Sequence, residues 1–184
     1  CITVYYDNVT IKNLEIVNFT KALYIEANSC TLTNNNVTYN QKGIEISGNY
    51  NNISFNNFLH NNQSLFLTNS FGNIIVGNNI TNSYIGLNII SGTDNLIYWN
   101  NFSSSALAHA NSSDQNHFNT TVGGKAQGNI WDDVAFLRIY DSDGDYWGDF
   151  GEDYPYSYAN GGHVLGTMQD FGPWTDLHEN PPVM

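Results

Sequence analysis

The feature that most constrains this chain is a pair of polar residues that recurs at a fixed spacing through the first half of the sequence. The pairs are Lys12-Asn13, Asn34-Asn35, Asn56-Asn57, Asn78-Asn79 and Asn100-Asn101, a period of 22. Two further columns keep the same register, namely Val9, Thr31, Ile53, Ile75 and Ile97, and Leu14, Asn36, Phe58, Ile80 and Phe102. A fixed period of this length is typical of a repeat architecture, in which each unit packs on copies of itself.

The residues between the pairs predict short strands. They form short runs that alternate apolar and polar types and are rich in β-branched side chains, separated by Asn, Gly and Ser. Two more apolar columns keep nearly the same period, with successive spacings of 21, 21 and 22 residues: Leu23, Ile44, Leu65 and Leu87, then Ile25, Ile46, Leu67 and Ile89. We therefore expect an all-β fold, a parallel β-helix of about five 22-residue coils over residues 1–120. We expect it to be right-handed, as parallel crossovers are.

The asparagine pairs predict an amide ladder. The second member is Asn in all five coils, whereas the first is Lys12 in one of them, and a buried lysine is costly. This places the second column inside, where identical amides bond from coil to coil. The predicted ladder is Asn13, Asn35, Asn57, Asn79 and Asn101. The alternative is an Asn-rich low-complexity tract, but such a tract would not keep the apolar columns in register.

Charge limits the classes of partner. The net charge is −12, and only five residues are Lys or Arg. Nucleic acid is excluded as a partner, because phosphate binding needs clustered cations. An anionic polysaccharide is disfavoured unless calcium bridges it. We expect no membrane span, because no stretch of about 18 apolar residues occurs.

The first residues of the chain predict an unpaired β-strand edge that another segment must cover. The run Thr3–Tyr6 reads as a strand, and an unpaired strand edge is normally covered in natural proteins. We expect either upstream chain or a copy of the same protein to cover it. Cys1 and Cys30 are separated by more than one coil, and this spacing leaves both a disulfide and free thiols open.

Glycosylation signals are in excess. Nine Asn-x-Ser/Thr sequons occur, which is about twice the chance number for this composition. They predict an extracellular glycoprotein of the cell surface, although turns favour the same residues. The expected acceptors are Asn8, Asn18, Asn52, Asn62, Asn111 and Asn119. We expect none at the inward Asn79 and Asn101, nor at Asn36 in its apolar column.

An acidic segment follows the repeat. Residues 121–184 are expected to close the coil stack, and 11 of the 17 acidic residues lie between Asp132 and Glu179. A loop that begins at Asp141 carries carboxylates at positions 1, 3, 5, 9 and 12, the ligand spacing of a calcium loop. The predicted calcium ligands are Asp141, Asp143, Asp145, the Trp147 carbonyl, Asp149 and Glu152. A solvated acidic turn is the alternative, and Asp153 is an alternative to Glu152.

These motifs together resemble a known family. The stretch from Gly128 to Asp133 (GNIWDD), the acidic loop and Tyr154-Pro155-Tyr156 follow the coils, as in the NosD-like parallel β-helix proteins of archaeal and bacterial surfaces. The resemblance implies that the GNIWDD stretch and the acidic loop close the C-terminal end, and that the domain serves carbohydrate binding or sugar hydrolysis. The sequence departs from the family at Tyr146, usually Gly, and at residues 134–140, usually a short acidic link.

The family's name is associated with copper delivery, which we do not expect here. The five histidines are scattered along the sequence, and Met168 and Met184 form no soft-ligand cluster.

Two functions remain open at this level. A polysaccharide lyase needs a basic residue, and a hydrolase needs two carboxylates about 5–10 Å apart. The coils hold few acids, of which Glu26 and Glu45 are the nearest to a pair. We therefore expect a non-catalytic extracellular module, structural or adhesive, of a cell-surface layer, sheath or filament. The alternative is a β-helix that binds or cleaves polysaccharide, with glycans as partners.

Overall fold

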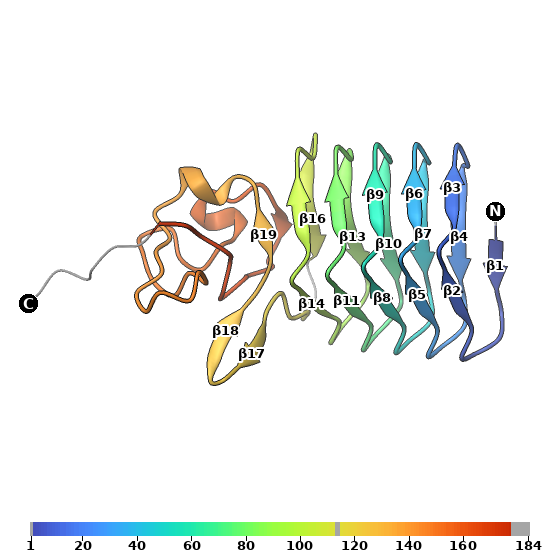
Figure 1. Cartoon of the computed structure of the whole chain (residues 1–184), viewed down its shortest axis with the longest axis horizontal. Helices are drawn as coiled ribbons and strands as arrows, with labels where there is room; N and C mark the ends of the chain where they lie inside the picture. Colours follow the sequence, from blue (N-terminus) through green and yellow to red (C-terminus); the bar gives the residue numbers. More distant parts are fainter. Residues whose placement is uncertain (1, 113–114, 178–184) are drawn as a thin grey trace, which may run out of the picture.

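The computed structural model describes residues 2–112 and 115–177 and shows a parallel β-solenoid of about five turns (Figure 1). This confirms the predicted fold class. Each turn contributes one strand to each of three parallel sheets, which run the length of the stack. No helix in the described part of the chain is long and apolar enough to cross a membrane. Cys1 lies outside the described residues, and Cys30 is buried with a free thiol.

The three sheets differ in strand length. Sheet 1 holds the longer strands β1 (Ile2–Val4), β4 (Lys21–Ile25), β7 (Lys42–Ile46), β10 (Gln63–Thr68), β13 (Ile85–Ile90), β16 (Ala108–Ser112) and β20 (Leu165–Gly166). Sheet 2 holds β2 (Thr10–Lys12), β5 (Thr31–Thr33), β8 (Asn52–Ser54), β11 (Ile74–Val76) and β14 (Leu96–Tyr98). Sheet 3 holds β3 (Glu15–Val17), β6 (Asn36–Thr38), β9 (Asn57–Leu59), β12 (Asn79–Thr81), β15 (Asn101–Ser103) and β19 (Ile130–Trp131).

Besides Asn69 and Ser91, left-handed residues that directly follow β10 and β13, each coil bends at three left-handed corner residues that are five positions apart. They are Asn8, Asn13 and Asn18; Ser29, Asn34 and Tyr39; Tyr50, Phe55 and His60; Gly72, Gly77 and Asn82; and Asp94, Trp99 and Ser104. Gly and Asn adopt this conformation readily. The residue that follows most of these corners is a buried Asn or Ser, whose side chain can bond to backbone groups freed by the bend.

The core is a set of apolar columns. Leu23, Ile44, Leu65 and Leu87 are fully buried and pair in register across sheet 1, as the sequence predicts. In sheet 3, Phe58, Ile80, Phe102 and Trp131 pair from coil to coil, and the rings of Phe102 and Trp131 stack at 4.6 Å. Trp131 therefore continues the apolar column beyond the last complete coil.

The inward amide ladder has a different membership from the prediction. It consists of Asn35, Asn56, Asn78, Asn100 and Asn129, all nearly inaccessible, and each Nδ2 donates to the Oδ1 of the next residue at 2.9–3.0 Å. Of the predicted ladder only Asn35 is inside. Asn13 is an exposed corner, and Asn57, Asn79 and Asn101 form a second ladder with Asn36 on the outer face of sheet 3.

A change in coil length explains the difference. Consecutive members of the inward ladder are 21 residues apart from Asn35 to Asn56 and 22 apart at each step from Asn56 to Asn100. The Asn34-Asn35 pair is therefore equivalent to Phe55-Asn56, not to Asn56-Asn57. The same shift makes Val37, not Asn36, the neighbour of Phe58 in the apolar column.

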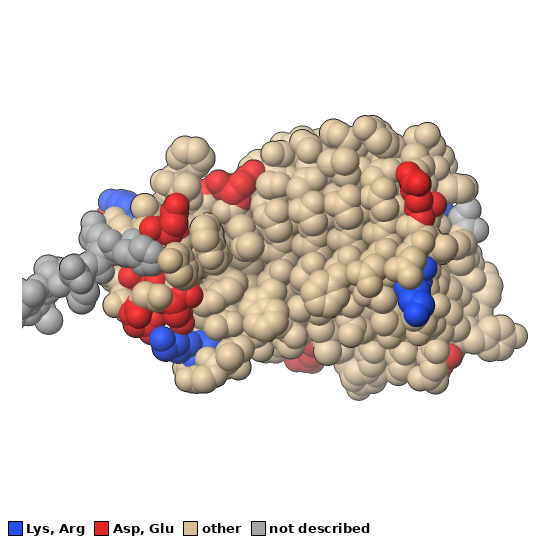
Figure 2. Space-filling model, viewed as in Figure 1, with Lys and Arg blue, Asp and Glu red and all other residues tan. Residues whose placement is uncertain are grey.

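The C-terminal part packs on the end of the stack. It contains the hairpin β17 (Thr120–Val122) and β18 (Lys125–Gln127) and the short 3-10 helices η1 (Val134–Phe136) and η2 (Tyr158–Asn160). Asp170 is fully buried and ends the amide ladder: its Oδ2 accepts from the Asn129 backbone N–H at 2.8 Å and from Trp131 Nε1 at 2.9 Å. Acidic side chains gather at this end of the molecule (Figure 2).

Candidate metal sites

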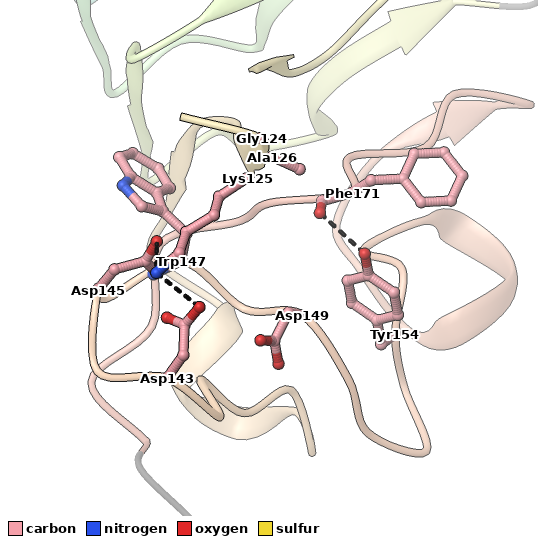
Figure 3. A pocket seen from close by; sticks show the side chains of 9 residues that line it. All are labelled: Gly124, Lys125, Ala126, Asp143, Asp145, Trp147, Asp149, Tyr154 and Phe171. Carbon is pink, nitrogen blue, oxygen red and sulfur yellow. Dashed lines mark hydrogen bonds and ion pairs between the residues drawn. The ribbon is translucent and has the colours of Figure 1, made fainter. Parts of the chain in front are cut away.

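The acidic loop lines a cavity at the end of the stack. The cavity has a volume of about 280 Å³, and its wall includes Asp143, Asp149 and Trp147 from the loop and Lys125 from the β17–β18 hairpin (Figure 3). Tyr154 and Phe171 form the opposite wall, where the Tyr154 hydroxyl donates to the Phe171 carbonyl at 2.9 Å. The loop is therefore an open, acidic surface with aromatic side chains beside it.

The carboxylates of the loop have partners within the chain. Asp141 is buried, and its oxygens accept from the backbone N–H groups of Asp143, Gly144 and Tyr146 at 2.7–3.0 Å. Burial alone would raise the pKa of the Asp141 carboxyl, but these hydrogen bonds lower it below its ordinary value. Asp149 accepts from the backbone and hydroxyl of Ser142.

Lysine and arginine side chains neutralise the remaining acids. The Lys125 ammonium lies 2.7 Å from Asp143 and 3.5 Å from Asp145, and its pKa is raised by these contacts. Arg138 pairs with Glu152 and Asp153. Part of the negative charge of the loop is therefore offset by cations of the chain itself.

Only part of the predicted ligand set comes together. Asp141, Asp143 and Asp149 each bring one carboxylate oxygen within 4.8 Å of the others. Glu152 instead pairs with Arg138 and is largely exposed, and Asp145 Oδ1 accepts from the Trp147 N–H at 3.0 Å. Glu152 and Asp145 are therefore not placed in the cluster.

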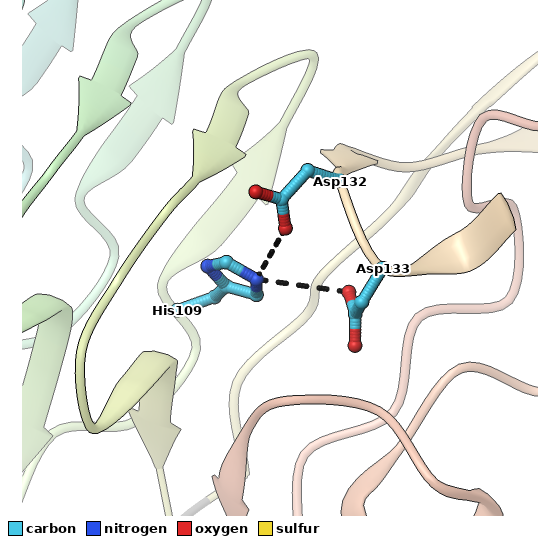
Figure 4. Close-up of side chains that lie close together, drawn as sticks. All are labelled: His109, Asp132 and Asp133. Atoms are coloured by element: carbon cyan, nitrogen blue, oxygen red, sulfur yellow. Dashed lines mark ion pairs between the residues drawn. The ribbon is translucent and has the colours of Figure 1, made fainter. Parts of the chain in front are cut away.

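A second cluster lies at the junction of the last coil and the C-terminal part (Figure 4). It consists of His109 on β16 and Asp132 and Asp133, which directly follow β19. His109 Nε2 is 2.8 Å from Asp132 Oδ1 and 3.7 Å from Asp133 Oδ1. One ligand atom from each residue lies within 4.8 Å of the others, the spacing of a group that can share one ion.

The imidazole of His109 is buried, and its two nitrogens differ in their contacts. The side chain is 1% exposed, Nε2 lies against the Asp132 carboxylate, and Nδ1 has no hydrogen-bond partner among the described residues. Burial lowers the pKa of His109, although the charges of Asp133 and Asp132 oppose that shift. A neutral imidazole is the form that binds metals.

The surrounding contacts fix Asp133. Its Oδ1 accepts from the Tyr156 hydroxyl at 2.8 Å, and its Oδ2 accepts from the His163 backbone N–H at 2.7 Å. Burial raises the pKa of Tyr156, so its hydroxyl remains a donor. The rings of His109 and His163 are 4.9 Å apart between centroids.

This cluster was not predicted, because histidines that are scattered along the sequence gave no sign of proximity. His109 and His163 are distant in the sequence but adjacent in the fold. A signal was present in the repeat. His109 occupies the inward sheet 1 column that in the preceding coils holds only small residues, Ala22, Gly43, Ser64 and Gly86. A titratable side chain in a small-residue column points to a special environment.

The sequon asparagines occupy two environments. Asn8, Asn18 and Asn62 are exposed, whereas Asn52, Asn111 and Asn119 are half-buried. The reason given for excluding Asn79 and Asn101 is wrong, because both lie on the outer face of sheet 3, and Asn36 is half-buried there rather than in the apolar core. Glycosylation itself stays a prediction.

Comparison with protein families matches residues 2–135 to the family described as "Periplasmic copper-binding protein (NosD)". Searches of curated proteins and of solved structures found no match. The description names copper, so calcium as the predicted cofactor is corrected. The match includes His109, Asp132 and Asp133 but ends before Asp141. Since the matched residues make up well over half of the chain, the chain belongs to the NosD family.

Proposed function

We propose that this chain is a copper(II)-binding β-helix module that acts outside the cytoplasm, with His109, Asp132 and Asp133 as the residues that hold the ion. The proposal depends on one observation: a buried imidazole lies beside two carboxylates, with its Nε2 2.8 Å and 3.7 Å from their oxygens. The family description, which names the periplasm and copper, supports the location and the metal.

The donor set fits this ion. His109 Nε2 and the two nearest carboxylate oxygens lie close enough together to contact one ion at the same time. Imidazole nitrogen with carboxylate oxygen is a donor combination that suits Cu²⁺, which also binds most tightly among the first-row divalent ions. Bound there, the ion would supply positive charge that offsets the charges of Asp132 and Asp133.

The protein holds these donors in place. His109 is fixed by its strand and packs near Trp131, with ring centroids 6.1 Å apart. Asp133 is fixed by the Tyr156 hydroxyl and the His163 N–H. Such outer contacts orient ligands and raise metal affinity, typically by about 10- to 100-fold.

The test is a Cu²⁺ titration of the full chain, followed by calorimetry and by the melting temperature. His109→Ala should weaken binding at least about tenfold and remove the Cu²⁺-dependent rise in melting temperature. His60→Ala is the matched control, because His60 is an exposed corner residue stacked on Tyr39. If the two variants bind Cu²⁺ equally well, the site is wrongly placed.

We also propose that the coil stack serves as a structural or adhesive scaffold at the cell surface. Glu45 on β7 is paired with both Lys21 and Lys42 at 3.0 Å, which leaves it poorly suited to act as a catalytic acid. Electron microscopy of the purified chain at micromolar concentration tests the scaffold role. Regular filaments or sheets would support it, and only monomers would argue against it.

Carbohydrate binding is a second candidate, favoured by the cavity beside the acidic loop. Aromatic faces of Trp147 and Phe171 with the carboxylate of Asp149 are groups that sugars use for stacking and hydrogen bonding. Titration of neutral oligosaccharides, followed by tryptophan fluorescence, tests this. Trp147→Ala should abolish any response, and Trp174→Ala, whose side chain lies outside the cavity wall, is the control.

A further inference from the structure

We infer that His163 is a further ligand of the same ion and binds it through Nδ1. The inference rests on the proposed copper site. The backbone of His163 is hydrogen-bonded to two of the three other proposed ligand residues. Its N–H donates to Asp133 Oδ2 at 2.7 Å, and its carbonyl accepts from the His109 N–H at 2.8 Å. These two bonds keep residue 163 beside the cluster.

The side chain has the right chemical form. His163 Nε2 lies 2.8 Å from the Leu107 carbonyl oxygen, which is only an acceptor. Nε2 must therefore carry the proton, so the neutral ring has its lone pair on Nδ1. Metal-binding histidines usually donate their other N–H to a carbonyl or carboxylate in this way. The Leu107 carbonyl thus contacts His163 in the way that orients the ring of a metal-binding histidine.

The ring lies beside the cluster, although its nitrogens are not among the ligand atoms that lie within 4.8 Å of one another, so the ring would have to shift to bind the ion. Its centroid is 4.9 Å from that of His109, with the two planes tilted by 48°. The side chain is exposed, in contrast to His109, so its ring can adjust without disturbing the core. Two imidazole nitrogens and two carboxylate oxygens make a four-donor set suited to Cu²⁺.

Such a site would join three parts of the chain. His109 belongs to the last coil, Asp132 and Asp133 follow β19, and His163 lies between η2 and β20. Loss of His163 should therefore weaken both the affinity for Cu²⁺ and the Cu²⁺-dependent protection of the C-terminal part against protease.

Electron spin echo spectroscopy of the Cu²⁺-loaded full chain counts the bound imidazoles. The wild-type chain should show two, and His163→Ala should show one, with affinity lowered about 10- to 100-fold. His117→Ala is the matched control, because His117 is also an exposed histidine near a single carboxylate, Asp94, at 3.9 Å. It should leave two imidazoles and the same affinity.

The outcomes separate the two proposals. One imidazole in the wild-type chain, lost in His109→Ala and kept in His163→Ala, would overturn the role of His163 and leave the copper site standing. No Cu²⁺ binding by the wild-type chain would overturn both. The wild-type count requires no variant, so misfolding of His163→Ala cannot obscure the answer.

Discussion

Replacing Asn78 by Ala should destabilise the chain far more than replacing its neighbour Asn79. Asn78 is 1% exposed, and its side chain makes five hydrogen bonds. Its Oδ1 accepts from the backbone N–H and Nδ2 of Asn56, and its Nδ2 donates to Ile53 O at 2.8 Å, Val76 O at 3.2 Å and Asn100 Oδ1 at 2.9 Å.

The magnitude follows from the groups that the substitution leaves without a partner. The buried N–H of Asn56 loses its acceptor, and the Ile53 carbonyl loses a donor. At about 1–3 kcal/mol for each such group, Asn78→Ala should lower the free energy of unfolding by about 3–5 kcal/mol. Asn79 is exposed, and its two side-chain bonds are made on the surface, so Asn79→Ala should cost about 0.5 kcal/mol or less.

Urea unfolding of both variants, followed by circular dichroism, measures the difference from the midpoints at an unchanged slope. Equal losses below about 1 kcal/mol would refute the account of the inward ladder. A larger loss of stability for Asn79→Ala than for Asn78→Ala would instead support the ladder predicted from the sequence, in which Asn79 points inward.

Three further changes test the C-terminal end. Burial raises the pKa of Asp170 from 3.8 to about 6, so its contribution to stability is full below pH 3.8 and is lost as the pH rises through 6. Between pH 4 and 7 the stability of Asp170→Asn relative to wild type should improve by about 3 kcal/mol, and a constant difference in chemical denaturation would contradict this. Gly128→Ala should open the C-terminal part to protease, because a Cβ there would collide with the Asp170 carboxylate. Gly123→Asn should not, because its Cβ meets no described atom within 4 Å and Asn tolerates the left-handed backbone of that position. Lys125→Ala should leave the melting temperature almost unchanged, because Lys125 and Asp143 form a partly exposed ion pair, and a large drop would show that the acidic loop depends on it.

The architecture was predictable because residues at equivalent positions of successive coils stack on each other and therefore share the same apolar or polar character. Leu65 and Leu87 are neighbours in the fold because both are apolar and lie one coil apart, and the same holds for Ile53 and Ile75. The amide register was not predictable from the pairs alone, because a shift of one residue moves an asparagine from the core to the surface. The shorter spacing of Leu23 and Ile44 already indicated the shift.

The candidate site was harder to predict, since it depends on long-range contacts. The sequence shows that acids concentrate after residue 131, but not that Lys125 and Arg138 neutralise several of them. The meeting of His109 with His163 depends on the irregular C-terminal path, which has no repeat to define it. The repeat predicts which residues are neighbours in adjacent coils, but it predicts no contacts in the C-terminal part, where the repeat ends.

The even spacing of the corners has a consequence for how such chains diversify. The three corners keep the same spacing in every coil, so the extra residue of the longer coils falls elsewhere. It enters where sheet 1 turns into sheet 2: Tyr50 is the fourth residue after Ile46, whereas Gly72 is the fifth after Leu67. One edge of the solenoid thus absorbs changes in length while the amide ladders keep their register. Insertions along that edge would let a lineage of such proteins acquire new surface loops on an unchanged scaffold.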